Sequence, residues 1–136
     1  MKLLTFQANF FQWATFSKTL DEVAELDVNE RMEDCVVAFI HAEEKDEGEA
    51  GRTLKHMLKH IKWVAGKGGM KRVVLHSFTH LGGRTASPSF AQELMGQLAE
   101  RLSNADYEVK QTPFGYFCSW NIDVRGESMA KVFKDI

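Results

Sequence analysis

A polar stretch with two histidines follows a short apolar segment near the middle of the chain. Val73-Val74-Leu75 is typical of a buried strand, and His76-Ser77-Phe78-Thr79-His80 follows it. Gly82-Gly83 allows the backbone to bend sharply or to approach a ligand, and Ser87-Pro88 is typical of a helix start. Because N–H groups at a helix start attract anionic or oxyanionic atoms, the stretch from Val73 to Ser89 predicts a site for polar chemistry.

His80 is the candidate catalytic residue of this stretch because it stands next to the double glycine. A histidine there can act as a base or donate a hydrogen bond to a carbonyl group. For His76 we favour a structural role. The role of His41, at the end of another apolar run, stays open.

His56 and His60 lie four residues apart on an expected helix, a spacing that can chelate a metal ion. Lys55, Lys59 and Lys62 crowd the same face, and no third ligand is near in the sequence. We therefore favour a solvated basic face, which could also contact phosphates, over a metal site.

Cys118 lies on an expected strand and could be a nucleophile if a histidine lay beside it, but a lone strand cysteine is more often a small core residue. The chain has no G-x-S-x-G motif and no paired-carboxylate motif, which leaves a serine triad or a glycosidase without support. Gly66-Lys67-Gly68-Gly69 lacks the P-loop spacing and indicates a helix end.

The composition is that of an ordinary globular protein. The 136 residues fit a single domain, 1–136, with 44% hydrophobic residues, 26% charged residues and a net charge of −2. The two cysteines lie far apart, which disfavours cysteine-based zinc binding and a disulfide framework. No apolar run approaches the roughly 18 residues of a membrane span, so we expect a cytoplasmic protein.

The pattern of apolar residues predicts an α/β (α+β) chain in the order β-β-β-α-β-α-β-β-α. The expected first hairpin joins strands 2–6 and 11–16 through a turn at Asn9, and the expected helices begin near residues 50, 88 and 129. The other expected strands are 35–42, which we expect to be central, 73–75, 107–110 and 116–124.

Three stretches, in this order and at about this spacing, resemble the archaeal-type editing domain of threonyl-tRNA synthetase. They are Met32 to Ile40, Ser77-Phe78-Thr79-His80-Leu81 through Ala86-Ser87-Pro88-Ser89, and Pro113-Phe114-Gly115-Tyr116-Phe117. Each stretch alone has modest specificity for this family, but the ordered set is fairly specific. The similarity runs from Lys2 to Ile136.

The resemblance implies a single β-rich domain of the D-aminoacyl-tRNA deacylase-like fold, which usually forms a homodimer. It implies hydrolysis of the ester in mischarged Ser-tRNA(Thr), with tRNA as the partner, no DNA or membrane, and no metal or cofactor. In this family the terminal ribose hydroxyl of the tRNA is thought to assist, while backbone N–H groups stabilise the oxyanion. For the homodimer, the apolar strand Phe11 to Phe16 could provide the edge.

The resemblance also assigns roles to residues. His80 matches the pocket histidine, Thr79 and Ala42 match pocket-lining positions, and Phe117 stands where the family has a tyrosine. Cys118 stands in place of a functional lysine. Gln7-Ala8-Asn9 also replaces a frequent His-Ser-Asp.

Lys131, expected on the last helix, stands in place of a glutamate. One hypothesis is that its ammonium group acts on the substrate from the helix side, so that His80 and Lys131 are the catalytic candidates. The expected function is a stand-alone deacylase that acts in trans on a mischarged tRNA. The alternatives are a homologue with another aminoacyl specificity, a non-catalytic module of the same fold that binds tRNA 3′ ends or a small ligand, and a cysteine hydrolase using Cys118 and His80.

Overall fold

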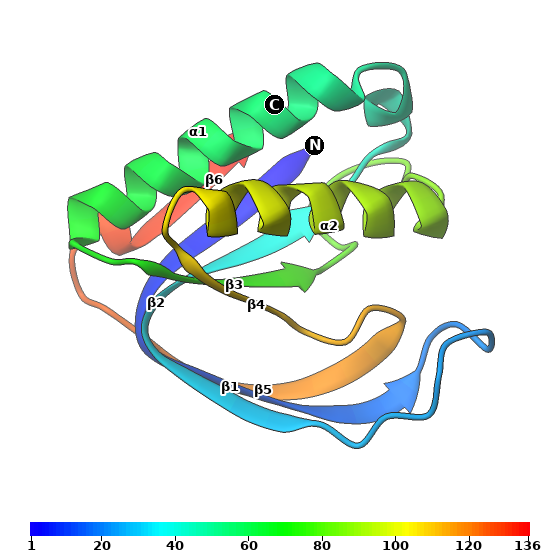
Figure 1. Ribbon diagram of the computed structural model, residues 1–136, viewed down its shortest axis with the longest axis horizontal. Helices are drawn as coiled ribbons and strands as arrows, with labels where there is room; N and C mark the ends of the chain where they lie inside the picture. The colour runs from blue at the N-terminus through cyan, green and yellow to red at the C-terminus, as the bar shows by residue number, and fades with distance from the viewer.

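The computed structural model describes residues 1–136 as one curled, six-stranded sheet with two helices packed on one face (Figure 1). The strands are β1 (Lys2–Lys18), β2 (Asn29–His41), β3 (Arg72–Ser77), β4 (Glu108–Gln111), β5 (Tyr116–Val124) and β6 (Lys131–Asp135). The helices are α1 (Ala50–Gly68) and α2 (Pro88–Asn104), with short 3₁₀ turns η1 (Glu44–Gly48) and η2 (Ser128–Ala130). No helix is long and apolar enough to cross a lipid bilayer.

The strand order is β4-β3-β2-β1-β5, and β6 pairs with the first half of β1. β1 therefore has β6 and then β5 along one edge, and β2 along the other. The pairs β2–β3 and β3–β4 are parallel, with α1 and α2 as their crossover connections. The central position expected for the strand that ends at His41 is confirmed, because β2 lies between β1 and β3.

The core has two parts, one on each face of the sheet. Val36, Ala38 and Ile40 of β2 belong to a cluster of 20 buried residues beneath the helices. The alternate residues Val37 and Phe39 belong to a cluster of 8 on the other face, which includes residues from the second half of β1. Because both faces of β2 are buried from Cys35 onward, residues 35–40 are continuously apolar, whereas the start of the strand is polar and largely exposed.

The expected first hairpin is wrong, because residues 2–18 form one strand. Asn9 lies at an irregularity of the β1–β5 ladder between Ala8 and Phe10, not in a turn. Its exposed side chain donates to Asp123 Oδ2 at 3.1 Å and accepts from Arg125 Nε at 3.2 Å. A bulge thus places a polar residue inside a long strand, near the point where the strand exchanges β6 for β5 as its partner.

The expected C-terminal helix is also wrong. Only Ser128–Ala130 forms a short 3₁₀ turn, and Lys131 begins strand β6. Met129, Val132 and Phe133 have helical spacing, but the segment pairs with the open edge of β1 instead, where Val132 lies opposite Thr5. The observed order is therefore β-β-α-β-α-β-β-β, apart from the two 3₁₀ turns.

A buried charge cluster fixes η1 to the start of the chain. The amino nitrogen of Met1 lies 2.7 Å from Glu43 Oε1 and 2.9 Å from Asp46 Oδ2, and Met1 is fully buried. Burial alone would raise the pKa of Glu43. The hydrogen bond and charge of the Met1 ammonium, followed by those of Lys2, outweigh burial and lower this pKa to about 2.

Replacing Glu43 with glutamine is expected to destabilise the fold strongly at pH 7 and much less at pH 3. Because the folded-state pKa lies below the ordinary value of 4.5, the stabilisation is complete above pH 4.5 and is lost as the pH falls through about 2. The shift corresponds to about 3 kcal/mol of unfolding free energy. Urea unfolding of both proteins at the two pH values measures the difference, and an equal difference at both would contradict the expectation.

Candidate active site

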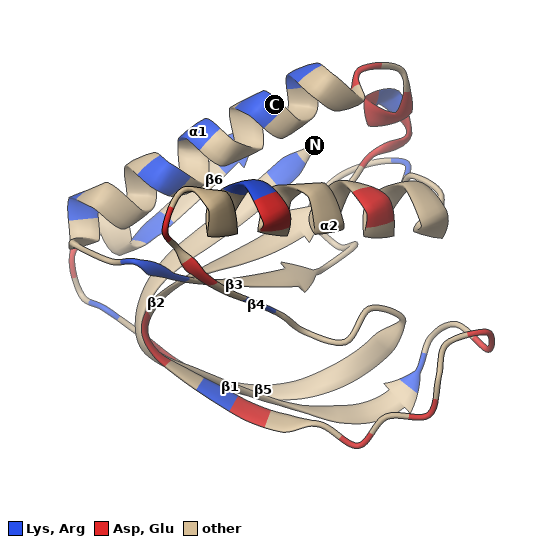
Figure 2. Cartoon of the chain, in the orientation of Figure 1, with Lys and Arg blue, Asp and Glu red and all other residues tan.

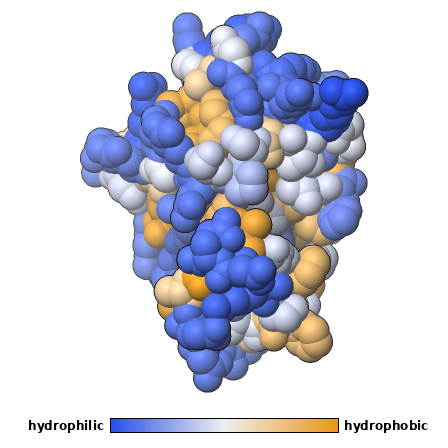
Figure 3. All heavy atoms as spheres, turned by 90° about the vertical axis from the view of Figure 1, so that its right-hand side faces the viewer, coloured by the Kyte–Doolittle hydropathy of each residue, from blue (hydrophilic) through white to orange (hydrophobic).

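A cavity of about 510 Å³ opens where β3, β5 and the first turn of α2 meet. Its walls are the end of β3 with the loop that follows, the β4–β5 connection with the start of β5, and Thr19 and Leu20 after β1. At this end of the molecule, hydrophobic atoms lie exposed between polar side chains (Figure 3). The volume is in the range of small-molecule sites, which run from about 300 to 1,000 Å³.

The stretch from Val73 to Ser89 forms one wall, with the predicted strand, loop and helix start. β3 ends at Ser77, and Ser87 caps α2 by accepting a hydrogen bond from the Phe90 amide at 3.4 Å. Between them, the amide of Phe78 donates to Ile40 O and the amide of Ala86 donates to Ala42 O, both at 2.9 Å. The end of β2 thus holds both ends of the loop that carries Thr79 and His80.

His41, left open by the sequence, holds the middle of this loop. It is fully buried, its Nδ1 accepts from the Leu81 amide at 3.1 Å, and its Nε2 lies 3.0 Å from Thr85 Oγ1. Since Nδ1 accepts, Nε2 carries the proton and donates to Thr85. Burial lowers the pKa of His41, which keeps Nδ1 an acceptor at neutral pH.

Replacing His41 with leucine is expected to loosen the loop without unfolding the sheet. The Leu81 amide loses its acceptor, so its hydrogen exchange should accelerate by about 10-fold or more. The Phe78 amide, which donates to Ile40 O, is the internal control and should keep its protection. Amide exchange followed by NMR measures both groups, and unchanged protection at Leu81 would show that His41 does not hold the loop.

Aromatic rings form the floor of the cavity. His76 is buried, and its Nδ1 lies 2.8 Å from Thr112 Oγ1. Burial lowers the pKa of His76 to about 4, so the ring is neutral at pH 7. The ring of Phe39 contacts both His76 and Trp120, at 5.1 and 5.2 Å between centroids, and those two rings lie 6.2 Å apart.

β5 and the loop before it form the opposite wall. Gly115 has a φ of +83°, and a Cβ on it would lie 2.7 Å from Val23 Cγ1, so only glycine fits this turn. The carbonyl of Gly115 accepts from the Thr19 amide at 2.7 Å, and Tyr116 Oη accepts from the Leu26 amide at 2.9 Å. These bonds attach the segment after β1 to the start of β5.

Four predicted site residues lie together in this cavity: Thr79, His80, Phe117 and Cys118. The ring of His80 packs edge-on against Phe78, 5.2 Å between centroids. Burial raises the pKa of the half-buried Cys118 thiol, so the thiol is protonated at pH 7.

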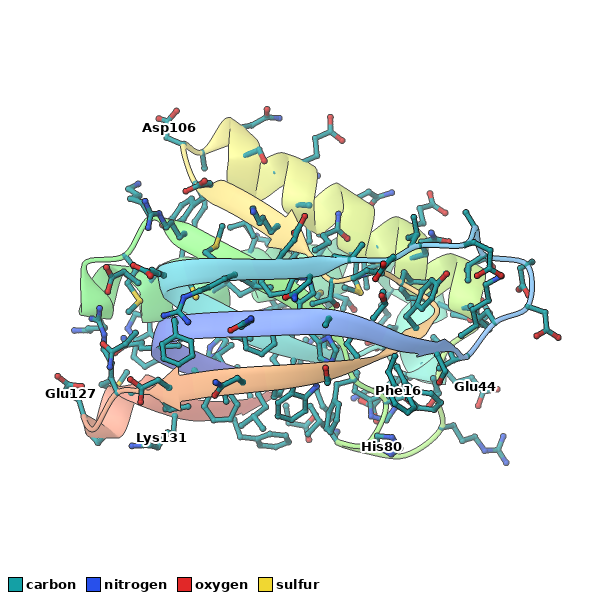
Figure 4. All side chains as sticks on the ribbon, turned by 90° about the horizontal axis from the view of Figure 1, so that it is seen from below. Phe16, Glu44, His80, Asp106, Glu127 and Lys131 are labelled. Atoms are coloured by element: carbon teal, nitrogen blue, oxygen red, sulfur yellow. The ribbon has the colours of Figure 1, made fainter.

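Ala42 and Lys131 lie outside the cavity. Ala42 is buried in the core beneath the helices, and only its carbonyl reaches the loop. Lys131 is exposed, lies on β6 instead of a helix, and pairs with Phe6, whereas Cys118 pairs with Thr15, nine positions along β1. Figure 4 shows His80 and Lys131 far apart along the sheet.

The sequence reasoning missed Trp120, His76 and Thr112 as cavity residues. The signal for Trp120 was present, because residues two apart on a strand share a face and Cys118 was already a candidate. The positions of His76 and Thr112 depend on the parallel pairing of β3 with β4, which no local pattern predicts.

The lining combines apolar side chains with polar ones and contains no Lys, Arg, Asp or Glu. The amides of Thr79 and His80 make no hydrogen bond within the protein, and both residues line the cavity. No group of three or more His, Cys, Asp or Glu side chains gathers anywhere as a metal site. The arrangement can hold a small polar group and donate hydrogen bonds to an oxyanion.

Comparisons with known proteins agree on one family. The model of the archaea-specific editing domain of threonyl-tRNA synthetase matches residues 1–136. The threonine–tRNA ligase of Methanococcus maripaludis is 31% identical over 138 residues, covering 100% of this chain and 22% of that protein. The corresponding enzymes of Thermococcus kodakarensis and Pyrococcus horikoshii are 25% and 27% identical, with the same coverage.

Among solved structures, the c-Myc DNA Unwinding Element Binding Protein aligns with a TM-score of 0.69 at 12% identity, covering 100% of this chain and 99% of that chain. At this identity the similarity shows the fold alone. The expected fold class, the D-aminoacyl-tRNA deacylase-like fold, is confirmed.

Proposed function

This chain belongs to the archaea-specific editing domain family of threonyl-tRNA synthetase, and we propose that it hydrolyses the aminoacyl ester of a mischarged tRNA. Membership assigns the chain to tRNA editing in translation. The chain spans about 22% of the length of the ligases that it matches. Action in the cytoplasm is part of the proposal.

The observation that carries the proposal is the shared position of Thr79, His80, Phe117 and Cys118 around one cavity. These residues come from two segments about forty positions apart in the sequence. Each had been matched to a pocket position of the family from the sequence motifs. Their convergence supports a pocket for the aminoacyl end of the tRNA.

The proposed mechanism needs no side-chain nucleophile, because an aminoacyl ester is already activated. The amides of Thr79 and His80 would donate to the oxyanion that forms when water attacks the carbonyl carbon. His80 would orient the ester or the water, and the terminal ribose hydroxyl of the tRNA would assist proton transfer. Since Lys131 lies outside the cavity, this mechanism proceeds without it.

A cysteine-dependent hydrolase is the less supported chemistry. A nucleophilic cysteine needs a lowered thiol pKa, and burial raises the pKa of Cys118. No hydrogen bond joins Cys118 to His80. We therefore assign Cys118 to the pocket wall.

For the substrate we propose Ser-tRNA(Thr). Serine and threonine differ by one methyl group, which a binding pocket distinguishes by only ~1–3 kcal/mol, so a synthetase benefits from a separate hydrolytic site. The lining of the cavity, which contains no Lys, Arg, Asp or Glu, is compatible with a small side chain such as that of serine. Cys118 in place of the family's lysine bears directly on this specificity.

We also propose a homodimer, but through a different surface from the one expected. Phe11 to Phe16 lie on a strand between β2 and β5 and provide no open edge. The open strands are β4, β5 and β6, and the exposed Phe16 and Phe117 lie close to the edge formed by β5. Sedimentation velocity of the wild type and of Phe16→Ser tests this: a dimer that the substitution does not weaken would place the interface elsewhere.

A deacylation assay on a panel of mischarged tRNAs tests the function. The panel contains Ser-tRNA(Thr), correctly charged Thr-tRNA(Thr) and several D-aminoacyl-tRNAs. We expect turnover of Ser-tRNA(Thr), with Thr-tRNA(Thr) spared. No turnover on any substrate would contradict the enzyme and favour the alternative, a non-catalytic module of the same fold that binds tRNA ends. Replacement of the family's lysine by Cys118 is the observation behind that alternative.

A further inference from the structure

The solvent-facing side of α1 carries a row of cations. Its charged side chains are Arg52, Lys55, Lys59, Lys62 and Lys67, and the helix has no acidic residue. At about 100° per residue they fall within a stripe of roughly 140°, about 22 Å long. Figure 2 shows this row along the length of α1, which itself carries no acidic residue, and acidic residues at η1 beside its start.

The four lysines of this row are among the cations of the protein that have no ion-pair partner. Nine of the 17 Lys and Arg residues form ion pairs. Lys55, Lys59, Lys62 and Lys67 form none. Like charges three or four positions apart destabilise a helix, so the row carries a small cost that the fold itself does not offset.

An aromatic side chain and a neighbouring strand extend the row. Trp63 is 46% exposed, with Lys59 and Lys67 one turn away on either side. Its ring lies 6.0 Å from that of His60. Thr5 Oγ1 lies 3.2 Å from His60 Nε2 and donates to Val132 O at 3.0 Å, so β6, which carries Lys134, lies close to the helix. An exposed indole among unpaired cations is suited to contact with nucleic acid.

The partner follows from charge and size. The cavity can hold the aminoacyl end of a tRNA but not its helical stem. Asp21, Glu22, Glu25 and Asp27 follow β1 beside the cavity, and they repel phosphates. α1 starts close to the cavity loop, since the amide of Glu44 in η1 donates to Arg84 O at 2.9 Å.

Resting on the proposed function for the choice of tRNA, we propose that the outer face of α1 binds the phosphate backbone of the tRNA stem outside the cavity. The aminoacyl end occupies the cavity, and Lys55, Lys59 and Lys62 neutralise phosphates of the stem. Trp63 lies against the sugar–phosphate backbone. The row supplies affinity for tRNA and takes no part in the hydrolytic step.

The test compares two triple variants that each remove three positive charges. Lys55→Gln, Lys59→Gln and Lys62→Gln together alter the row, and glutamine preserves helix propensity. Arg31→Gln, Arg101→Gln and Lys110→Gln together are the control, on β2, α2 and β4 instead of α1. Circular dichroism confirms that both variants are folded. Binding to uncharged tRNA is measured between 50 and 200 mM KCl.

We expect the row variant to bind tRNA about 10-fold or more weakly at 50 mM KCl, with the slope of log K against log salt reduced by about 3. The control should stay within about twofold of the wild type. A short aminoacylated oligonucleotide ending in CCA should be hydrolysed equally by all three proteins. Any of three results would overturn the proposal. The row variant could keep the wild-type affinity and salt slope, the control could lose as much affinity as the row variant, or the wild type could fail to bind tRNA. Because binding is measured on uncharged tRNA, the test of the α1 surface gives a result even if the protein hydrolyses none of the substrates.

Discussion

Replacing Cys118 with tryptophan is expected to lower kcat/KM for deacylation by about 100-fold or more while the protein stays folded. Cys118 lies on the cavity face of β5, where the larger indole would occupy space that the aminoacyl group needs. β5 is an edge strand and already carries Trp120 two positions along on the same face, so a second tryptophan suits it. The assay uses the best substrate of the panel, and thermal unfolding monitors the fold.

Ser119→Trp is the matched control, because Ser119 is the next residue of β5 and faces the other side of the sheet. It borders a shallow hollow of about 380 Å³ with Gln12 and Asn121, and its replacement should leave deacylation within about twofold. Cys118→Ser should also retain activity, since the thiol is not the nucleophile in the proposed mechanism. Full activity in Cys118→Trp would show that the substrate binds outside this cavity. Loss of activity in Cys118→Ser would show that the thiol takes part in the reaction.

The elements that a local pattern determines were predicted well. The buried face of α1 is marked in the sequence by apolar residues at helical spacing, such as Leu54, Met57 and Ile61. The cap of α2 was predicted from Ser87-Pro88, and β5 has the expected bounds, Tyr116–Val124. In these segments the periodicity of burial and the terminal residues both act within a few positions.

The two wrong elements are those whose state depends on distant partners. Asn9 indicates a turn if only its neighbours are considered, but β2 pairs along nearly the whole of β1 and keeps the strand continuous. Met129, Val132 and Phe133 indicate a helix, but the first half of β1 offers an open edge that a strand can pair with. Formation of sheet hydrogen bonds outweighs a weak local preference in both cases.

The same distinction applies to the candidate site. Thr79 and His80 follow a strand directly, so their place at a loop is a local property. Trp120 is in the cavity because β1 curls and brings β5 over the face of β2 that carries Phe39. The motif match put Lys131 beside the other candidates, but the register of β6 on β1 sets its actual position.

Replacing Phe39 with alanine is expected to lower the free energy of unfolding by ~3–5 kcal/mol. Phe39 is 4% exposed, and it contacts more aromatic rings than its neighbours in the sheet. Its ring centroid lies 5.1 to 6.2 Å from those of Phe6, Phe11, His76, Phe78 and Trp120. The loss is a large part of the ~5–15 kcal/mol that stabilises a typical domain. Urea unfolding at pH 7 measures it.

Phe133→Ala is the matched control, because Phe133 is 52% exposed on β6 and its truncation should cost at most about 0.5 kcal/mol. Phe39→Leu keeps an apolar side chain of similar size but removes the ring. It should retain much of the stability, yet His76 and Trp120 lose the aromatic ring that lies closest to both. Those two rings form the floor of the cavity. Phe39→Leu should therefore lower the rate of deacylation even under conditions in which the variant is fully folded. A cost below about 1 kcal/mol for Phe39→Ala would mean that the aromatic cluster adjusts around the gap, and that the floor of the cavity is not rigid.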